Sequence, residues 1–214
     1  MIVTLFSGGK DSTYCAHLAG ECTLLTMVPD REDSYMFHHP NISLAPQIAG
    51  CMGLDIVVEE TPGEKEKELD DLRDALGRLK PEKVFSGAVA SSYQKTRVDA
   101  ICSDLRIESV APLWAKPQDD VLAEELGSGM EILIVGVYAD GLGEEWLGRR
   151  LDAEAADELR AMNLSPVGEG GEFETIVVDA PFFGKRLEIT DFEKKWDGVR
   201  GTYEIKGARV VSKS

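Results

Sequence analysis

The chain has 214 residues, of which 43% are hydrophobic, so it can fold as one large domain or as two small lobes with buried cores. Acidic side chains outnumber basic ones by 39 to 23, which gives a formal net charge of −16. This balance argues against a protein that grips long nucleic acid, because such proteins neutralise phosphates with a basic face. It favours a basic or cationic partner instead.

No apolar run is long enough to span a bilayer, and the N-terminal residues already have the pattern of a buried strand. We therefore expect a cytoplasmic protein that does not use a membrane. Four scattered cysteines form no CxxC pair, and the three histidines add no zinc-binding spacing to them. Buried, reduced thiols and no structural metal are expected.

The first half of the chain alternates apolar, strand-like segments with helical ones. We expect strands at 2–6, 22–28, 54–58, 83–88 and 107–110, and helices at 12–19, 64–80 and 94–105. A further helix starts near Asn41 or Ser43, either of which can cap it, and Pro46 is tolerated in its first turn. This alternation predicts an α/β fold with a doubly wound, Rossmann-like parallel sheet.

One helical face in this half is explained by packing alone. In the helix at 64–80, four leucines recur at helical spacing while the charged residues lie elsewhere: Leu69, Leu72, Leu76 and Leu79. We expect this face to be buried in the core and to carry no chemistry.

The pattern changes after two prolines, Pro112 and Pro117, which mark an expected boundary between residues 1–115 and 116–214. The second part should be a smaller α/β lobe. We expect helices at 119–126 and 153–162, and strands at 132–137, 175–178, 186–189 and 202–211.

The strongest chemical signal is the segment FSGGKDS, which spans residues 6–12 between the first strand and the first helix. Gly8 and Gly9 allow a tight turn with exposed N–H groups, and the helix start adds positive potential. Lys10 adds a mobile positive charge, and Ser7 and Ser12 add hydroxyl donors. The segment is neither GxxxxGK[ST] nor GxGxxG, and although a plain glycine-rich turn is the alternative, its position favours a phosphate-binding loop.

The loop matches the SGGxDS signature and resembles the PP-loop ATP pyrophosphatases. That resemblance implies the HUP/PP-loop fold and a loop that holds the β- and γ-phosphates of ATP, which leaves the α-phosphorus open to attack. Asp11 would organise Mg²⁺ or cap the helix. Because open α/β sheets bind ligands at the carboxyl ends of their strands, the adenine should lie near Met27.

Three further segments narrow the resemblance: SGAVASSYQKTR at 86–97, PLW at 112–114 and GEGGEFET at 168–175. Together with the loop they resemble the diphthine–ammonia ligase family, in its short single-module form, from Val3 to about Pro181. MFHHPN at 36–41 is also similar, although His39 departs from the threonine expected there.

This resemblance implies an ATP-dependent carbon–nitrogen ligase. Such an enzyme amidates diphthine, a modified histidine on translation elongation factor 2, with ammonium. The reaction passes through an acyl-adenylate and gives diphthamide, AMP and pyrophosphate. Residues 1–115 would then be the PP-loop ATP-binding domain, and residues 116–214 the substrate-binding lobe. We expect free ammonium as the nitrogen donor, since no cysteine has the context of a glutaminase nucleophile and no length remains for a glutaminase domain.

Three carboxylates in the last motif are candidate catalytic residues alongside Lys10 and Asp11: Glu169, Glu172 and Glu174. They would surround the trimethylammonium group of diphthine, coordinate magnesium or accept a proton from ammonium. A solvated acidic turn is the alternative, and the resemblance favours function. The individual role of each glutamate is left open.

The helix after the fourth strand contributes further ATP-binding candidates, namely Tyr93, Gln94 and Arg97, with Gly87 just before it. By the strand-end rule these side chains should reach the α-phosphate or the substrate carboxylate, although a helix-start arginine such as Arg97 is often only solvated. The rival interpretations are a PP-loop ligase acting on tRNA and an ATP-binding module without catalysis. The oligomeric state is left open, and an oligomer is compatible with the sequence.

Overall fold

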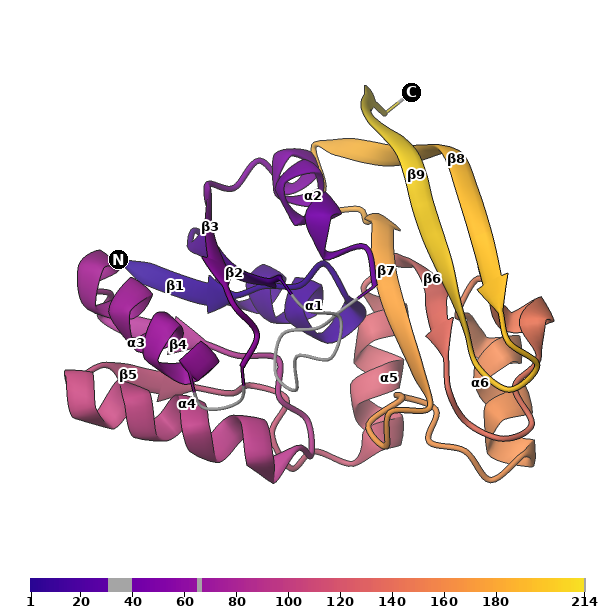
Figure 1. Cartoon of the computed structure of the whole chain (residues 1–214), viewed down its shortest axis with the longest axis horizontal. Helices are drawn as coiled ribbons and strands as arrows, with labels where there is room; N and C mark the ends of the chain where they lie inside the picture. Colours follow the sequence, from indigo (N-terminus) through magenta and orange to yellow (C-terminus); the bar gives the residue numbers. More distant parts are fainter. Residues whose placement is uncertain (31–39, 65–66, 214) are drawn as a thin grey trace.

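The computed structural model describes residues 1–30, 40–64 and 67–213. Two β-sheets lie next to one another, and helices pack on both of them (Figure 1). Residues 2–110 build the first sheet and its helices, while both long strands of the C-terminal hairpin belong to the second sheet.

The first sheet is parallel and has the strand order β3-β2-β1-β4-β5. Its strands are β1 (Ile2–Leu5), β2 (Thr23–Pro29), β3 (Ile56–Thr61), β4 (Lys83–Phe85) and β5 (Glu108–Val110). This confirms the doubly wound α/β fold. β4 ends three residues earlier than expected, because the chain turns away at Gly87 to pack against the first helix.

Helices cover both faces of this sheet. They are α1 (Lys10–Ala19), α2 (Ala45–Met52), α3 (Lys67–Leu79) and α4 (Ser92–Leu105). α3 and α4 enclose one core with β1, β2 and β4, in which Leu72 and Leu76 are fully buried and Leu69 and Leu79 partly buried. The leucine face therefore packs in the core as expected. α1 and α2 lie in the other core.

The start of α2 differs from the expectation. Neither Asn41 nor Ser43 caps this helix, because a short 3₁₀ helix (Ile42–Leu44) precedes it and Leu44 stands at the N-cap. The Asn41 side chain instead donates to Tyr203 O at 2.9 Å and accepts from Ile205 N at 2.8 Å. A side chain that satisfies two backbone groups of a strand fastens this part of the chain to the second sheet.

The second sheet is antiparallel, with the order β7-β6-β9-β8. Its strands are β6 (Glu131–Val137), β7 (Phe173–Asp179), β8 (Lys185–Trp196) and β9 (Gly201–Ser212), accompanied by α5 (Gln118–Gly127), α6 (Ala153–Ala161) and a 3₁₀ helix, η2 (Glu144–Trp146). β8 is longer than the expected 186–189, because its polar continuation pairs with β9 along its whole length. The domain boundary near residue 115 stays a prediction.

A single hydrophobic core joins the two sheets. Tyr14 of α1 and Ile48 of α2 belong to the same buried cluster as Ile134 of β6 and Phe173 of β7. Burial of this apolar surface holds the second sheet against the first. All four cysteines are buried free thiols that form no disulfide. None of the described helices is long and apolar enough to cross a membrane.

Candidate active site

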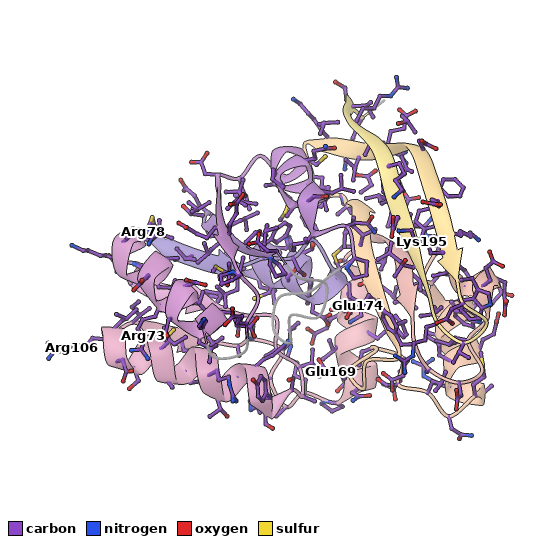
Figure 2. All side chains as sticks on the ribbon, in the orientation of Figure 1. Arg73, Arg78, Arg106, Glu169, Glu174 and Lys195 are labelled. Atoms are coloured by element: carbon purple, nitrogen blue, oxygen red, sulfur yellow. The ribbon has the colours of Figure 1, made fainter. Side chains whose placement is uncertain are left out.

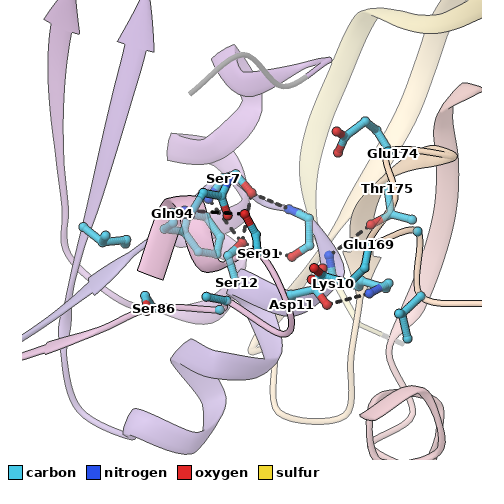
Figure 3. A pocket seen from close by; sticks show the side chains of 18 of the residues that line it. Ser7, Lys10, Asp11, Ser12, Ser86, Ser91, Gln94, Glu169, Glu174 and Thr175 are labelled. Atoms are coloured by element: carbon cyan, nitrogen blue, oxygen red, sulfur yellow. Dashed lines mark hydrogen bonds and ion pairs between the residues drawn. The ribbon is translucent and has the colours of Figure 1, made fainter. Parts of the chain in front are cut away.

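The candidate site is a cavity of about 490 Å³ beside the carboxyl ends of β1 and β4. The strand order reverses between these two strands, and ligands of open α/β sheets bind at that point. Residues from both halves of the chain line the cavity: most of residues 5–12 and several of residues 86–94 on one side, and most of residues 167–175 on the other (Figure 3).

The loop after β1 has a compact backbone fixed by its own hydroxyl groups. Ser7 Oγ and Ser12 Oγ lie 3.1 Å apart, and Ser12 Oγ donates to Gly9 O at 3.1 Å. Gly8 adopts a φ of +83°, a conformation that favours glycine, and a Cβ there would lie 2.7 Å from Ile48 Cδ1. Ser7, Gly9 and Ser12 line the cavity, as expected of a phosphate-binding loop.

The expectation of a mobile charge on Lys10 does not match the structure. Its side chain is 1% exposed, and Nζ lies 2.6 Å from Asp11 Oδ1 and 3.3 Å from Glu125 Oε2 of α5. An ammonium held by two carboxylates cannot swing freely, because leaving them would strand buried charges. Lys10 still lines the cavity, and its catalytic role stays a prediction.

The three charges shift one another's protonation. Burial lowers the pKa of Lys10, but the carboxylates of Asp11 and Glu125 outweigh burial and hold it above its usual range. Burial, followed by repulsion from Asp11, raises the pKa of Glu125 well above its usual range. The ammonium therefore stays charged, and its attraction offsets part of the cost of burying a charged Glu125.

β7 of the second sheet is hydrogen-bonded directly to this loop. Thr175 Oγ1 accepts from Lys10 N at 3.2 Å, and Val177 N donates to Gly8 O at 2.9 Å. Thr175 also lines the cavity. The loop is thus held between the first sheet, from which it emerges, and the edge strand of the second sheet.

Glu169 and Glu174 both line the cavity (Figure 3). Glu169 Oε2 accepts from Ala90 N at 3.1 Å, and burial, followed by repulsion from Asp11, raises the pKa of Glu169. Burial, together with the negative charge of Glu174, raises the pKa of Tyr138 to about 12. Two carboxylates are therefore brought to the side of the cavity that faces the loop.

Glu172 is placed differently from its two neighbours. It does not line the cavity, and its carboxylate accepts from Gly170 N at 2.8 Å and Ser165 N at 3.4 Å. Its backbone carbonyl also accepts from Tyr138 N. A side chain that satisfies backbone donors of its own turn fixes the shape of that turn. The geometry therefore favours a bracing role for Glu172, and its catalytic role stays an untested prediction.

Residues of the first sheet and α4 complete the other side of the cavity. Met27, Gly87, Tyr93 and Gln94 all line it. A Cβ at Gly87 would lie 2.8 Å from Asp11 C and 2.9 Å from Ser12 N, so only glycine allows this approach. The Arg97 guanidinium instead lies over the Tyr93 ring, 3.5 Å from its centre, and Arg97 is not among the cavity-lining residues.

Four polar residues of this site were not predicted individually from the sequence. Thr175, Ser86 and Ser91 stand inside motifs that had been singled out, and all three line the cavity. Ser91 also caps α4, accepting from Gln94 N. Glu125 had no signal, since it stands beside another glutamate in an ordinary charged helix. Only the three-dimensional packing distinguishes the fully buried Glu125 from Glu124, which is half-buried.

The residues of the site can hold Mg²⁺ only together with the phosphates of a bound substrate. No cluster of three histidine, cysteine or acidic side chains able to hold a metal occurs in the described part of the chain. Mg²⁺ is commonly bound by one or two carboxylates plus substrate phosphates, so such a cluster is not required. Asp11, 30% exposed at the cavity, is a suitable single ligand.

Family models match nearly the whole length in two parts. The model of the diphthamide synthase N-terminal domain matches residues 1–109, and that of the diphthamide synthase C-terminal domain matches residues 118–211. The chain belongs to the diphthine–ammonia ligase family.

Named relatives agree with this membership. A diphthine–ammonia ligase of Schizosaccharomyces pombe is 34% identical over 90% of this chain and 36% of that protein. The Danio rerio diphthine–ammonia ligase is 31% identical, over 88% of this chain and 86% of that protein. The chain therefore spans about a third of the length of the yeast relative and most of that of the fish relative. The Homo sapiens diphthine–ammonia ligase is 28% identical, over 90% of this chain and 84% of that protein.

A solved structure from Methanocaldococcus jannaschii, described as a predicted subunit of tRNA methyltransferase, is 18% identical over 84% of this chain and 97% of that chain. Its TM-score of 0.44 is too low to support an inference.

The diphthine–ammonia ligase motifs converge in the structure. The loop, the segment at 86–97 and the segment at 168–175 are far apart in the sequence, yet each contributes residues to the same cavity. Residues 36–39 of the MFHHPN segment, including His39, lie outside the described residues.

Proposed function

We propose that this chain catalyses the ATP-dependent amidation of diphthine on translation elongation factor 2 with ammonium. The products are diphthamide, AMP and pyrophosphate, and the intermediate is an acyl-adenylate. The observation that carries the proposal is the single cavity lined by the phosphate-binding loop and by the carboxylates of the C-terminal motif. Membership of the diphthine–ammonia ligase family supports the choice of substrate.

The loop side of the cavity is suited to ATP. The Gly9 N–H and the hydroxyl groups of Ser7 and Ser12, which bond to one another within the loop, would turn to the β- and γ-phosphates at the N-terminus of α1. The helix dipole also favours negative charge there. The α-phosphorus then faces the acceptor side. Attack by the substrate carboxylate forms its bond to this phosphorus while the bond to pyrophosphate breaks.

The proposed role of Asp11 is to hold magnesium together with the phosphates of ATP. When bound, the metal would neutralise charge on the departing pyrophosphate. Lys10 keeps Asp11 oriented through the 2.6 Å ion pair, rather than reaching the phosphates itself. Its charge still adds to the positive potential at the loop.

The acceptor side is acidic. Among the described cavity-lining residues, the basic side chain is Lys10 and the acidic ones are Asp11, Glu169 and Glu174. Figure 2 shows the labelled Glu169 and Glu174 between the two halves of the molecule, whereas the labelled Arg73, Arg78 and Arg106 lie at its edge, beside α3 and α4. A cavity of this charge gains from ligands that bring positive charge, which supports a cationic acceptor and an ammonium donor.

The nitrogen donor must lose a proton before it attacks. Ammonium gives a proton to a carboxylate, and the resulting ammonia bonds to the acyl carbon. The bond to AMP breaks, and the nitrogen releases a second proton to solvent to give the neutral amide. We assign the proton acceptor to Glu169, because it lines the cavity and its raised pKa makes it a stronger base than an ordinary glutamate. Glu174 is assigned to the cationic part of the acceptor.

Product analysis tests this proposal. The protein is incubated with ATP, magnesium, ammonium and diphthine-bearing elongation factor 2, and nucleotides are separated with each component omitted in turn. The proposal predicts sustained formation of AMP and pyrophosphate only when every component is present, and at most a single turnover of pyrophosphate release when ammonium alone is omitted. ADP as the product would contradict it, because ADP indicates attack at the γ-phosphorus.

A further inference from the structure

The hydroxyl of Ser86 is buried at the cavity and unsatisfied. Ser86 follows β4 directly, its side chain is 6% exposed, and Oγ has no hydrogen-bond partner in the described part of the chain. The same residue lines the cavity (Figure 3). A buried hydroxyl without a partner has lost its hydrogen bonds to water and gained none in return, so such a group calls for an explanation.

The backbone does not relieve this cost. Ser86 N donates to Val110 O at 3.0 Å, so the main chain continues the β4–β5 ladder for one more bond and is held in place. The register that pairs Thr4 with Phe85 sets Ser86 beside Leu5. Ser86 is therefore fixed at the strand ends, with its hydroxyl left for a ligand.

Ser86 lies at the end of an apolar row of the sheet. The cavity wall contributed by β1, β2 and α4 includes Leu5, Leu25, Met27 and Val98. Leu5 pairs with Leu25 across β1 and β2, so these side chains occupy one row with Ser86 at its end. A largely apolar wall with one hydroxyl suits a flat heteroaromatic ring with a hydrogen-bonding edge.

The phosphates of ATP have their donors elsewhere, in the loop after β1. A nucleotide whose phosphates lie on Ser7–Ser12 extends its base towards the strand ends, where this apolar wall stands. We propose that the Ser86 hydroxyl hydrogen-bonds the edge of the adenine ring and is a specificity-determining residue for ATP. This inference rests on the proposed use of ATP and adds the residue that reads its base.

The test compares Ser86→Ala with the unchanged protein in two measurements. The first is the melting temperature of the ligand-free protein, which should stay equal or rise, because the substitution removes an unpaired buried hydroxyl. The second is binding to ATP and to pyrophosphate, both with magnesium, by titration calorimetry. Affinity for ATP should fall about 3- to 10-fold, while affinity for pyrophosphate stays unchanged.

Thr13 offers a matched control. Its Oγ1 is also buried and without a partner among the described residues, but Thr13 does not line the cavity. Thr13→Val should leave ATP affinity unchanged. A loss of ATP affinity in Thr13→Val equal to that in Ser86→Ala would show a general effect of removing buried hydroxyls near the loop, and would overturn the assignment.

Further outcomes separate the inference from the proposed function. Unchanged ATP affinity in Ser86→Ala, with normal binding by the starting protein, overturns the inference alone. A starting protein that binds neither ATP nor pyrophosphate would defeat the proposed function itself. The contact is assigned to the base, so ATP and 2′-deoxy-ATP should lose affinity equally on substitution; a loss confined to ATP would place the hydroxyl on the ribose and contradict it.

Discussion

The hydroxyl of Thr175 accepts a hydrogen bond from the backbone N–H of Lys10, 3.2 Å away and 165 positions earlier in the chain. The bond joins the edge strand of the second sheet to the loop that follows β1. One residue before it, Glu174 lines the cavity. The acceptor side and the ATP side of the site are therefore connected through adjacent residues of a single strand.

Replacing Thr175 by valine tests this connection. Valine keeps the shape but leaves the buried N–H of Lys10 without its acceptor, so the free energy of unfolding should fall by about 1–3 kcal/mol. Chemical denaturation measures the change. Thr175→Ser, which keeps the hydroxyl, is the matched control and should lose less. Equal stability of the valine variant and the starting protein would show that the bond contributes nothing.

The ion pairs of Lys10 predict that this residue matters for folding as well as for catalysis. Lys10→Met removes the only cation paired with Glu125 among the described residues, and breaking a buried pair costs about 3–5 kcal/mol. Adding Glu125→Met should recover most of that stability, because the uncompensated carboxylate is then gone. Denaturation of the two single variants and the double variant measures the coupling. Additive losses would contradict a direct interaction between Lys10 and Glu125.

Two neighbouring glutamates should respond differently to substitution. Glu172→Ala removes acceptors of two backbone N–H groups and should lower the free energy of unfolding by about 1–2 kcal/mol. Glu174→Gln removes a charge from the cavity and should lower kcat/KM for the acceptor at least about tenfold, with stability nearly unchanged. Denaturation and steady-state kinetics on both variants distinguish them. The reverse pattern would exchange the two roles.

The raised pKa of Glu169 predicts a pH dependence of stability. Burial raises this pKa above 4.5, so between 4.5 and the raised value the folded protein binds more protons than the unfolded chain. Stability contributed by Glu169 is therefore complete below pH 4.5 and is lost as the pH rises through that window. Glu169→Gln cannot titrate, so its stability relative to the starting protein should increase over the same window. A constant difference would contradict the raised pKa.

Much of the fold was predictable because it depends on local patterns. Short apolar runs gave the parallel strands, and leucines at helical spacing gave α3, because a buried face imposes its period on the sequence. The antiparallel pairing of the second sheet was not predicted. The polar half of β8 lacks a clear pattern, and its strand geometry depends on pairing with β9.

The site was predictable to the extent that it is made of contiguous motifs. The glycine loop and the glutamate segment could be found from residue type and spacing. The burial of Lys10, its pairing with Glu125 and the orphaned hydroxyl of Ser86 could not, because each depends on which distant element packs against it. Strand alternation alone would place Glu172 and Glu174 on one face; they diverge because Glu172 precedes β7 and its carboxylate bonds within the turn before the strand, which was visible only in the structure.

The most direct test of the account is intact-mass analysis of elongation factor 2 after the reaction. Diphthine-bearing factor is incubated with this protein, ATP, magnesium and ammonium, in parallel with ammonium that carries the heavy nitrogen isotope. The account predicts the mass change of a carboxylate converted to a primary amide, with the heavy isotope retained in the product. An unchanged factor, in a preparation shown to bind ATP, would contradict the assignment of diphthine as the acceptor.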